Sequence, residues 1–271
     1  MTKYIAIFLS KVCNNIPLHT SKLRIMIKEF SQKYQLTAGE CTPQREMSLP
    51  VLMNRIIEIA TFHANSWGAG YERLIADNQA WVLSRVTIEM ETYPKVNEEY
   101  VMTTWIEDYN RHFSLRNMVI TSVDGKTMGY VRTMWVVIDL ATRASVDISK
   151  LSYIVENVSP RPCPIEPQER MRAMTPTRTL EHTFGSVECD VNRHVNTVRY
   201  LELMLNQFPL EKFDNQLLYR TELAFVKETR YAETVTVNID DSDPEKCGIS
   251  LDNESGCHCR GLFKFKPREN T

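Results

Sequence analysis

The densest group of chemically active side chains lies in the segment from Cys189 to Asn196. Asp190, Asn192 and His194 stand two residues apart there, and in extended backbone such side chains project to one side. A helical pattern follows at once, and the N–H groups and positive dipole end of a helix start can stabilise an oxyanion. The pattern is typical of acyl-transfer chemistry. The same residues also suit a plain helix start, with Asp190 or Asn192 as the cap and His194 in the first turn.

The first half of the chain predicts one helix followed by an antiparallel sheet. Apolar residues from Leu49 to Ala60 follow a helical stripe, with Ser48 placed for an N-cap and Pro50 in the first turn. Alternation over residues 82–90 predicts a half-buried strand. Three more strands are indicated by β-branched and aromatic residues at 100–107, 113–123 and 128–139, with a hairpin turn at 124–125.

A proline-rich connector precedes a second unit of the same kind. Residues 159–178 contain five prolines, a density that prevents continuous helix or ladder pairing. Beyond them, strands are expected at 219–225, 235–239, 246–251 and 258–266. Before these strands, a second helical stripe consists of Val195, Val198, Leu201, Leu205 and Phe208.

The repeated element order predicts an α+β tandem (double) hotdog, in which each half is a long helix wrapped by a curved antiparallel sheet. The two sheets are expected to join edge to edge, with both helices along their concave faces. We expect an N-terminal extension at 1–27, an N-terminal hotdog at 28–158, the connector at 159–178 and a C-terminal hotdog at 179–267. A duplicated chain supplies its own dimer interface, so a monomer suffices, although an exposed sheet edge would permit a homodimer.

Composition and charge exclude several other classes. The 32 Lys and Arg residues are balanced by 34 Asp and Glu residues, so no excess of positive charge suggests a nucleic-acid partner. The apolar run from Tyr4 to Leu9 is far shorter than a membrane span, so no membrane anchor is expected. Seven cysteines form an odd set that does not suit a secreted disulfide framework, which favours reduced thiols and a cytoplasmic location.

Two weaker signals have simpler interpretations. Cys247, Cys257, His258 and Cys259 could bind zinc, but they lack a Cys-x-x-Cys pair and suit a strand face, so neither a metal nor a cofactor is expected. Residues 1–28 are basic and lack acids, as in organelle transit peptides, yet an extension of unclear role is the simpler interpretation.

The segment from Asp190 to Tyr200, Asp-Val-Asn-Arg-His-Val-Asn-Thr-Val-Arg-Tyr, resembles the Asp-x-Asn-x-His-Val-Asn-Asn-Val-x-Tyr motif of the acyl-acyl carrier protein thioesterases. These double hotdog enzymes hydrolyse fatty acyl thioesters. Residues 223–229, Leu-Ala-Phe-Val-Lys-Glu-Thr, are similar to the family strand whose catalytic Glu corresponds to Glu228. The resemblance covers roughly residues 28–267 and includes, in the first half, Leu52, Met53, Asn54, Glu58, Ala60, Trp81, Val82, Tyr93 and Pro94.

The resemblance implies hydrolysis of fatty acyl-acyl carrier protein (acyl-ACP) thioesters, which releases free fatty acid and terminates chain elongation in fatty acid biosynthesis. Glu228 is expected to deprotonate the attacking water, while Asn192 and the helix N–H groups bind the thioester oxygen. His194 would assist proton transfer, and Asp190 would orient His194 or Asn192. An acyl-CoA thioesterase and a non-catalytic acyl-binding hotdog protein remain as alternatives.

One position departs from the family pattern. Many members have Cys directly after the catalytic Glu, where this chain has Thr229, and an unactivated hydroxyl is a far weaker nucleophile than a thiolate. Either activity is lost or the Cys is not the nucleophile. We favour the second interpretation, because hydrolysis requires only a positioned water, a base and an oxyanion site.

Substrate contacts are expected in both halves. An acyl tunnel in the first half would be lined by Met53, Ile56, Ile57, Trp105 and Trp135, with Met90, Met118 and Met134 as further candidates, although apolar stripes usually pack the fold. The partner implied is an acyl carrier protein, which is acidic. Its candidate docking charges are Arg193, Arg199, Arg220, Lys227 and Arg230, each of which also suits an ordinary surface residue.

Overall fold

The computed structural model describes residues 28–151, 157–171 and 174–268, so the expected extension at 1–27 lies outside the described residues. The first half begins with β1 (Glu29–Gln35), the 3-10 turn η1 (Ala38–Glu40), α1 (Leu49–Ser66) and α2 (Tyr71–Ala76). Strands β2 (Gln79–Met90), β3 (Glu99–Tyr109), β4 (Ser114–Ser122) and β5 (Thr127–Asp139) follow, and η2 (Ile148–Lys150) ends this half.

The second half repeats this order with a shorter first helix. It contains β6 (Arg178–Thr183), η3 (Ser186–Glu188), α4 (Thr197–Leu205), α5 (Leu210–Asn215) and β7 (Gln216–Phe225). Strands β8 (Thr234–Asp243), β9 (Lys246–Asn253) and β10 (Gly256–Pro267) complete it. Among the described helices, none is long and apolar enough to cross a membrane.

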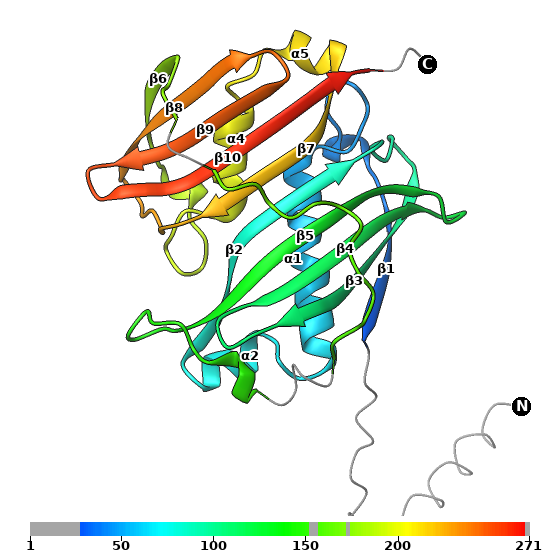
Figure 1. Ribbon diagram of the computed structural model, residues 1–271, viewed down its shortest axis with the longest axis vertical. Helices are drawn as coiled ribbons and strands as arrows, with labels where there is room; N and C mark the ends of the chain where they lie inside the picture. The colour runs from blue at the N-terminus through cyan, green and yellow to red at the C-terminus, as the bar shows by residue number, and fades with distance from the viewer. Residues whose placement is uncertain (1–27, 152–156, 172–173, 269–271) are drawn as a thin grey trace, which may run out of the picture.

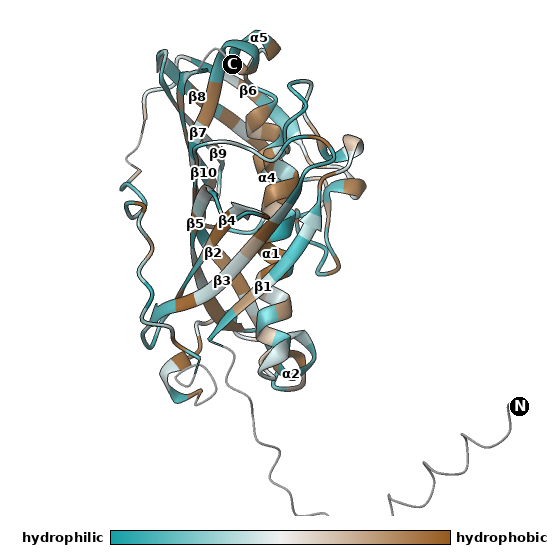
Figure 2. Ribbon diagram, turned by 90° about the vertical axis from the view of Figure 1, so that its right-hand side faces the viewer, coloured by the Kyte–Doolittle hydropathy of each residue, from teal (hydrophilic) through white to brown (hydrophobic). Residues whose placement is uncertain are grey.

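The ten strands of the described residues form one antiparallel sheet in the order β1-β3-β4-β5-β2-β7-β10-β9-β8-β6 (Figure 1). The two halves meet where β2 pairs with β7, and Val86 lies directly opposite Leu223 in that pairing. Both long helices lie on the same side of the sheet (Figure 2). The predicted double hotdog, with its edge-to-edge sheets, is therefore confirmed.

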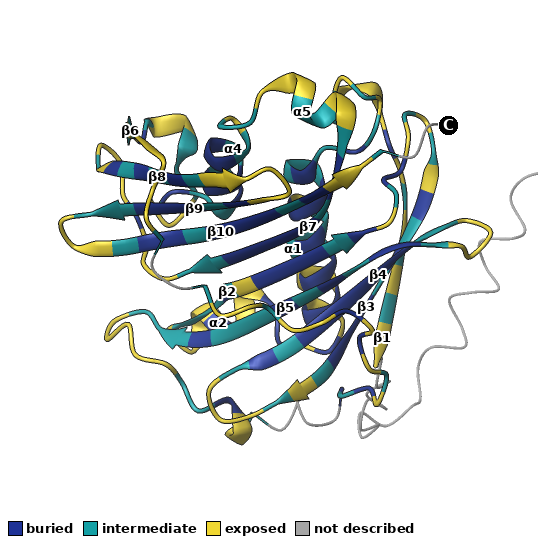
Figure 3. Ribbon diagram, turned by 45° about the horizontal axis from the view of Figure 1, so that its top comes forward, coloured by how far each residue is buried: buried dark blue, intermediate teal, exposed yellow. Residues whose placement is uncertain are grey.

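The start of α1 follows the expected local rules. The Ser48 hydroxyl accepts a hydrogen bond from the Val51 N–H at 3.4 Å, and Pro50 occupies the first turn, where its missing N–H costs nothing. The buried stripe of α1 packs into a main core that also contains Leu201 and Met204 of α4. One core therefore serves both halves (Figure 3).

The second helix is shorter than its apolar stripe predicted, because α4 covers only Thr197–Leu205. Val195 precedes the helix, and its N–H bonds to the Thr229 carbonyl at 2.8 Å. Phe208 follows the helix and lies just before Pro209, the residue that precedes α5. Both side chains contact the main core, so their apolar character reflects packing and not helix periodicity.

The connector crosses the face of the sheet opposite to the helices. The indole N–H of Trp105 in β3 donates to the Arg161 carbonyl at 2.6 Å, and the Gln168 amide donates to the Leu223 carbonyl of β7 at 2.8 Å. Cys163 and Ile165 are buried there in a small cluster that also contains Trp105. The proline-rich segment therefore covers the outer face of the sheet on both sides of the β2–β7 junction.

Candidate active site

The motif residues lie in a tight turn between η3 and α4, and not in the extended backbone expected from their spacing. Asp190 N–H bonds to the His194 carbonyl at 2.8 Å, and Arg193 N–H bonds to the Asp190 carbonyl at 3.0 Å. Arg193 has a φ of 64°, in the left-handed region. This turn reverses the chain so that Cys189 pairs with Val195.

Asp190 organises the turn through the backbone of its neighbours. Its Oδ1 accepts hydrogen bonds from the N–H of Asn192 at 2.8 Å and of His194 at 3.3 Å. The expected orienting contact to the side chains of these residues is thus replaced by contacts to their main chain. The alternative that Asp190 or Asn192 caps the helix is wrong, because Asn196 holds that position.

The Asn196 side chain accepts from the Val198 N–H at 2.9 Å, and its carbonyl accepts from the Arg199 N–H at 2.8 Å. These two N–H groups of the first turn of α4 are therefore already occupied. The structure gives no support for their use as an oxyanion site. The sequence predicted two kinds of oxyanion donor, the Asn192 side chain and the helix N–H groups. Of these, the Asn192 side chain remains, and it is exposed.

Glu228 and His194 come together although they belong to different segments. Glu228 lies just beyond the end of β7, in a loop rather than in the strand that the sequence suggested. His194 pairs with Arg230 in an isolated bridge, which sets the two loops side by side. The His194 Nε2 lies 3.4 Å from the Glu228 Oε2. The carboxylate and the imidazole are thus within reach of each other.

Arg143 also contacts this candidate site, although no feature of the sequence predicts it. It lies in the turn after β5, with a φ of 60°, and its Nη2 forms an ion pair with the Glu228 Oε1. Arg143 and Glu228 come from opposite halves of the chain and meet only because β2 joins β7. No spacing rule along one strand or helix could have connected them.

A cavity of about 200 Å³ opens beside Asn192. Its walls come from α1, α2 and strands β2 to β5 of the first half, whereas Asn192 is contributed by the second half. Of the predicted tunnel residues, Ile57 and Trp135 line this cavity. The cavity is mainly apolar, and it places the motif loop of one half against the helix face of the other.

The other tunnel candidates lie elsewhere. Met53 and Ile56 are fully buried in the main core and do not line the cavity, and the same core contains Met90 and Met118. Trp105 packs against the connector on the opposite face of the sheet, so its assignment to the tunnel is wrong. Its hydrophobicity reflects burial beneath the connector.

One wall of the cavity carries polar groups. Arg116 of β4 lines the cavity and is nearly fully buried, with its Nη1 2.8 Å from the His63 Nδ1 of α1 and 3.2 Å from the Thr104 hydroxyl. In the sheet, β4 is separated from β2 by β5, so these groups lie across the sheet from the junction with the second half. A ligand that extends from Asn192 to this end meets polar groups there.

Thr229 faces the interior and not the cavity. Its side chain is fully buried, and its hydroxyl lies 2.7 Å from the His258 Nδ1 of β10. Its N–H donates to the Tyr200 hydroxyl at 3.0 Å. Burial lowers the pKa of His258 below its usual value of 6.5. Glu228 and the residue after it thus point to different environments.

The candidate docking charges divide into three groups. Arg193, Lys227 and Arg230 are exposed on the loops that carry the site. Arg199 is half-buried and pairs with Glu202 at 2.6 Å along α4. Arg220 is buried at the β2–β7 junction between Glu89 and Glu222, both at 2.6 Å, so a docking role for this residue is wrong.

Two of the four candidate zinc ligands serve as packing residues. Cys247 and Cys259 are buried in the main core, and both are free thiols. Within the described part of the chain, no group of three or more His, Cys, Asp or Glu side chains is arranged to hold a metal ion.

Comparison with known families agrees with this arrangement. A model of the acyl-ACP thioesterase N-terminal domain matches residues 27–153, and a model of the C-terminal domain of the same family matches residues 177–262. The chain belongs to the acyl-ACP thioesterase family.

Solved structures of acyl-ACP thioesterases share this fold. A crystal structure of an acyl-ACP thioesterase from Bacteroides thetaiotaomicron is 31% identical, with a TM-score of 0.80, and the match covers 88% of this chain and 98% of that chain. The 12:0-ACP thioesterase from Umbellularia californica is 18% identical, with a TM-score of 0.79, over 89% of this chain and 98% of that chain. At this lower identity, the similarity shows the fold alone.

Plant acyl-ACP thioesterases are more distant and longer. A chloroplastic acyl-[acyl-carrier-protein] hydrolase of Cuphea viscosissima is 24% identical over 81% of this chain and 56% of that protein. A chloroplastic palmitoyl-acyl carrier protein thioesterase of Gossypium hirsutum is 24% identical over 88% of this chain and 64% of that protein. The chain thus spans between half and two thirds of the length of these relatives.

Proposed function

We propose that this protein hydrolyses fatty acyl-ACP thioesters and releases free fatty acid, which terminates chain elongation. The observation that carries this proposal is the contact at 3.4 Å between Glu228 and His194, because His194 lies on the same loop as Asn192, which lines the cavity. Membership of the acyl-ACP thioesterase family supports the choice of substrate.

In the mechanism we propose, Glu228 accepts a proton from water as the water oxygen attacks the thioester carbonyl. The Asn192 side-chain amide donates to the oxygen that becomes negatively charged. When the carbon–sulfur bond breaks, His194 passes the proton from Glu228 to the departing thiolate. Arg143 holds one oxygen of Glu228 and leaves the other directed toward His194. No step requires a thiol at position 229, because Thr229 is turned into the core.

We further propose a division of labour between the halves. Residues 28–158 supply the cavity walls for the acyl chain, residues 179–267 supply Asn192, His194 and Glu228, and the connector at 159–178 fixes the two halves together. The origin of the cavity walls in α1, α2 and β2 to β5 supports this division.

The carrier is proposed to dock on the exposed charges Arg193, Lys227 and Arg230. These residues are on the loops that carry the site, so an acidic carrier bound there would present its acyl thioester to Asn192. Coenzyme A is also anionic, so acyl-CoA hydrolysis is the second candidate. We propose a reducing cytoplasmic location, which the odd number of cysteines supports.

The proposal is tested with purified protein and a panel of acyl chains carried on ACP or on coenzyme A, with products read by mass spectrometry. Glu228→Ala and Asn192→Ala should each lower kcat by about 10²-fold or more, since a general base contributes about 10²–10⁴ and an oxyanion donor about 10²–10³. Glu254→Ala, which removes an exposed carboxylate between β9 and β10, is the matched control. Intact thioesters across the panel would reject the enzyme and favour the non-catalytic acyl-binding protein.

A further inference from the structure

The loop that carries the motif has a counterpart in the first half, 148 residues earlier. Arg45 and Arg193 both have a left-handed φ, of 61° and 64°. The Thr42 N–H bonds to the Glu46 carbonyl at 2.8 Å, as the Asp190 N–H bonds to the His194 carbonyl at 2.8 Å. The same offset relates the two N-caps, Ser48 of α1 and Asn196 of α4. Backbone geometry is thus retained where side chains differ.

The counterpart of the Glu228 loop is equally clear. The Met47 N–H bonds to the Pro94 carbonyl at 2.8 Å, as the Val195 N–H bonds to the Thr229 carbonyl at 2.8 Å. This places Tyr93, the residue before Pro94, at the position of Glu228. In the first half, the positions of Asp190, Asn192, His194 and Glu228 are therefore occupied by Thr42, Gln44, Glu46 and Tyr93.

The β2–β7 pairing shows that a pseudo-two-fold axis relates the halves. Gln79 begins β2 and Gln216 begins β7, so equivalent residues of the two strands are 137 positions apart. Val86 and Leu223 are also 137 positions apart and lie opposite each other, so each of them pairs with its own equivalent in the other half. Each motif loop therefore faces the helix side of the opposite half. The cavity beside Asn192 should have a counterpart beside Gln44.

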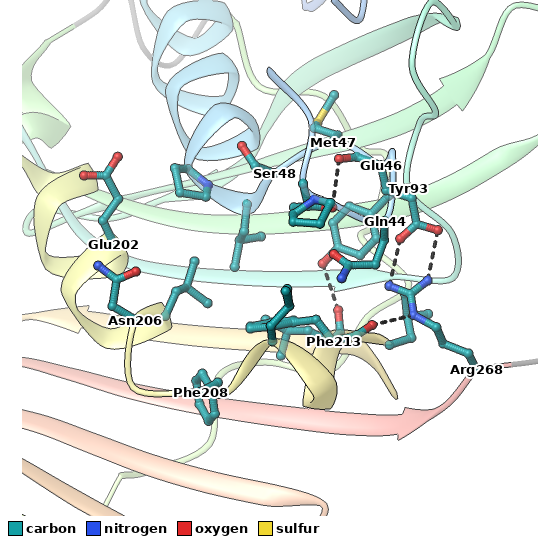
Figure 4. Close-up of a pocket in the computed structure, with 18 residues that line it drawn as sticks. Gln44, Glu46, Met47, Ser48, Tyr93, Glu202, Asn206, Phe208, Phe213 and Arg268 are labelled. Carbon is teal, nitrogen blue, oxygen red and sulfur yellow. Dashed lines mark hydrogen bonds and ion pairs between the residues drawn. The ribbon is translucent and has the colours of Figure 1, made fainter. Parts of the chain in front are cut away.

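A cavity of about 490 Å³ does lie beside Gln44 (Figure 4). Its second-half walls are formed by α4, α5 and β7, the counterparts of α1, α2 and β2 at the cavity beside Asn192. The first half contributes residues of the segment 42–50 and Tyr93, a larger share than the second half gives to the other cavity. It is the larger of the two, and it falls within the usual range for ligand pockets, roughly 300–1,000 Å³. Its apolar lining includes Leu205, Phe208, Leu210, Phe213 and Leu217.

This second cavity lacks the means for hydrolysis. Arg268 holds the Glu46 carboxylate through two hydrogen bonds of 2.9 and 3.0 Å, and Figure 4 shows Arg268 between Glu46 and Phe213. Tyr93 is buried, and its hydroxyl donates to the Leu218 carbonyl at 2.8 Å. Neither group is available to deprotonate a water. The lining carboxylates of Glu46 and Glu202 are each paired with an arginine, Arg268 and Arg199, so the described lining offers no free cation to an anionic head group.

We propose that the cavity beside Gln44 is a second acyl site, which binds the alkyl chain of an uncharged fatty acyl ester without cleaving it. The occupant is inferred from the pseudo-two-fold equivalence to the cavity beside Asn192, so this step rests on the proposed function. Gln44 takes the place of Asn192 at its mouth. Its side-chain Nε2 donates one N–H to Asp214 Oδ1 at 2.7 Å, and the second N–H is the donor that we assign to the ester oxygen.

The test measures how many molecules of radiolabelled 1-decanol the full chain binds in equilibrium dialysis. Wild type should bind two. Leu205→Trp, which fills the second cavity, should bind one, and Leu210→Arg, at an exposed rim position, should weaken one of the two sites at least tenfold. Ile57→Trp, in the cavity beside Asn192, should remove the other molecule. A parallel titration with decanoate compares a carboxylate head group with the uncharged hydroxyl of decanol, and decanol is expected to bind more tightly.

A single bound decanol in wild type, or two that persist in both Leu205→Trp and Leu210→Arg, would overturn the proposal. If Leu205→Trp fails to fold, Leu210→Arg decides, because Leu210 is 51% exposed. Acyl-ACP hydrolysis is assayed on the same preparations. Two decanol sites that respond to these substitutions, without any hydrolysis of acyl-ACP, would reject the enzyme and retain the second acyl site. Hydrolysis of acyl-ACP by a protein with a single decanol site would support the enzyme and reject the second acyl site.

Discussion

Glu228 is held from two sides by residues of different origin. Arg143 contacts one carboxylate oxygen from the first half, and His194 approaches the other from the motif turn. Asp190, Asn192 and His194 could be predicted from sequence because they are close together along the chain, and Glu228 because a family motif includes it. Arg143 could not, because only the joined sheet brings it to the site.

We predict that Arg143 is a positioning residue. Arg143→Ala should lower kcat by about tenfold to a hundredfold with little change in KM, because a base displaced by about 1 Å loses much of its effect. Arg143→Lys should recover part of the rate, since it retains a cation for Glu228. Arg111→Ala, which removes an exposed arginine from the turn between β3 and β4, is the control. An Arg143→Ala enzyme with wild-type kcat would refute this role.

At the scale of elements, local sequence signals predict the positions of strands and helices well. They predict less well which side chains face the core and which face outward. Ser48, Pro50 and the turn at 124–125 act through nearby backbone, so their sequence signatures are sufficient. Trp105 was misplaced because the connector buries the outer face of the sheet, and a strand covered on both faces carries no clear alternation. The end of α4 was overestimated for a similar reason, since Phe208 is apolar but packs from a turn.

The burial of His258 in β10, beneath the Thr229 loop, makes stability depend on pH. Because burial lowers the pKa of His258, the unfolded chain binds a proton there more readily than the folded chain. This contribution to the free energy of unfolding is complete above pH 6.5 and is lost as pH falls below it.

We therefore predict that wild type loses more stability between pH 7 and pH 5 than His258→Gln does, as measured by urea unfolding. The comparison between the two proteins cancels most of the titration of carboxylates, which they share. His112→Gln, which replaces an exposed histidine, should follow the wild-type pH profile. Parallel profiles for wild type and His258→Gln would contradict the prediction.

At the scale of the whole molecule, the β2–β7 junction holds the two halves in one sheet. Arg220 is buried there between Glu89 and Glu222, and its guanidinium also donates to the Glu166 and Pro167 carbonyls of the connector at 3.1 Å. The duplicated architecture was predictable from the repeated element order. The burial of this arginine was not, because in sequence it looks like any charged residue near the motif.

We predict that Arg220→Ala lowers the free energy of unfolding by about 3–5 kcal/mol, because Glu222 is left as an uncompensated buried charge. Arg193→Ala, at an exposed position, should change it by less than about 0.5 kcal/mol. Denaturant unfolding of both variants provides the measurement. A loss below about 1 kcal/mol in Arg220→Ala would show that the junction does not depend on this ion pair.

The covalent fusion of the two halves also determines how the protein can evolve. In a dimer of identical subunits, every substitution appears at both related sites, so neither site can change without the other. Here the loop at 36–48 and the loop at 184–196 are encoded separately, and a mutation alters one of them alone. Glu46 and Tyr93 can therefore differ from His194 and Glu228, and each cavity is free to acquire its own selectivity.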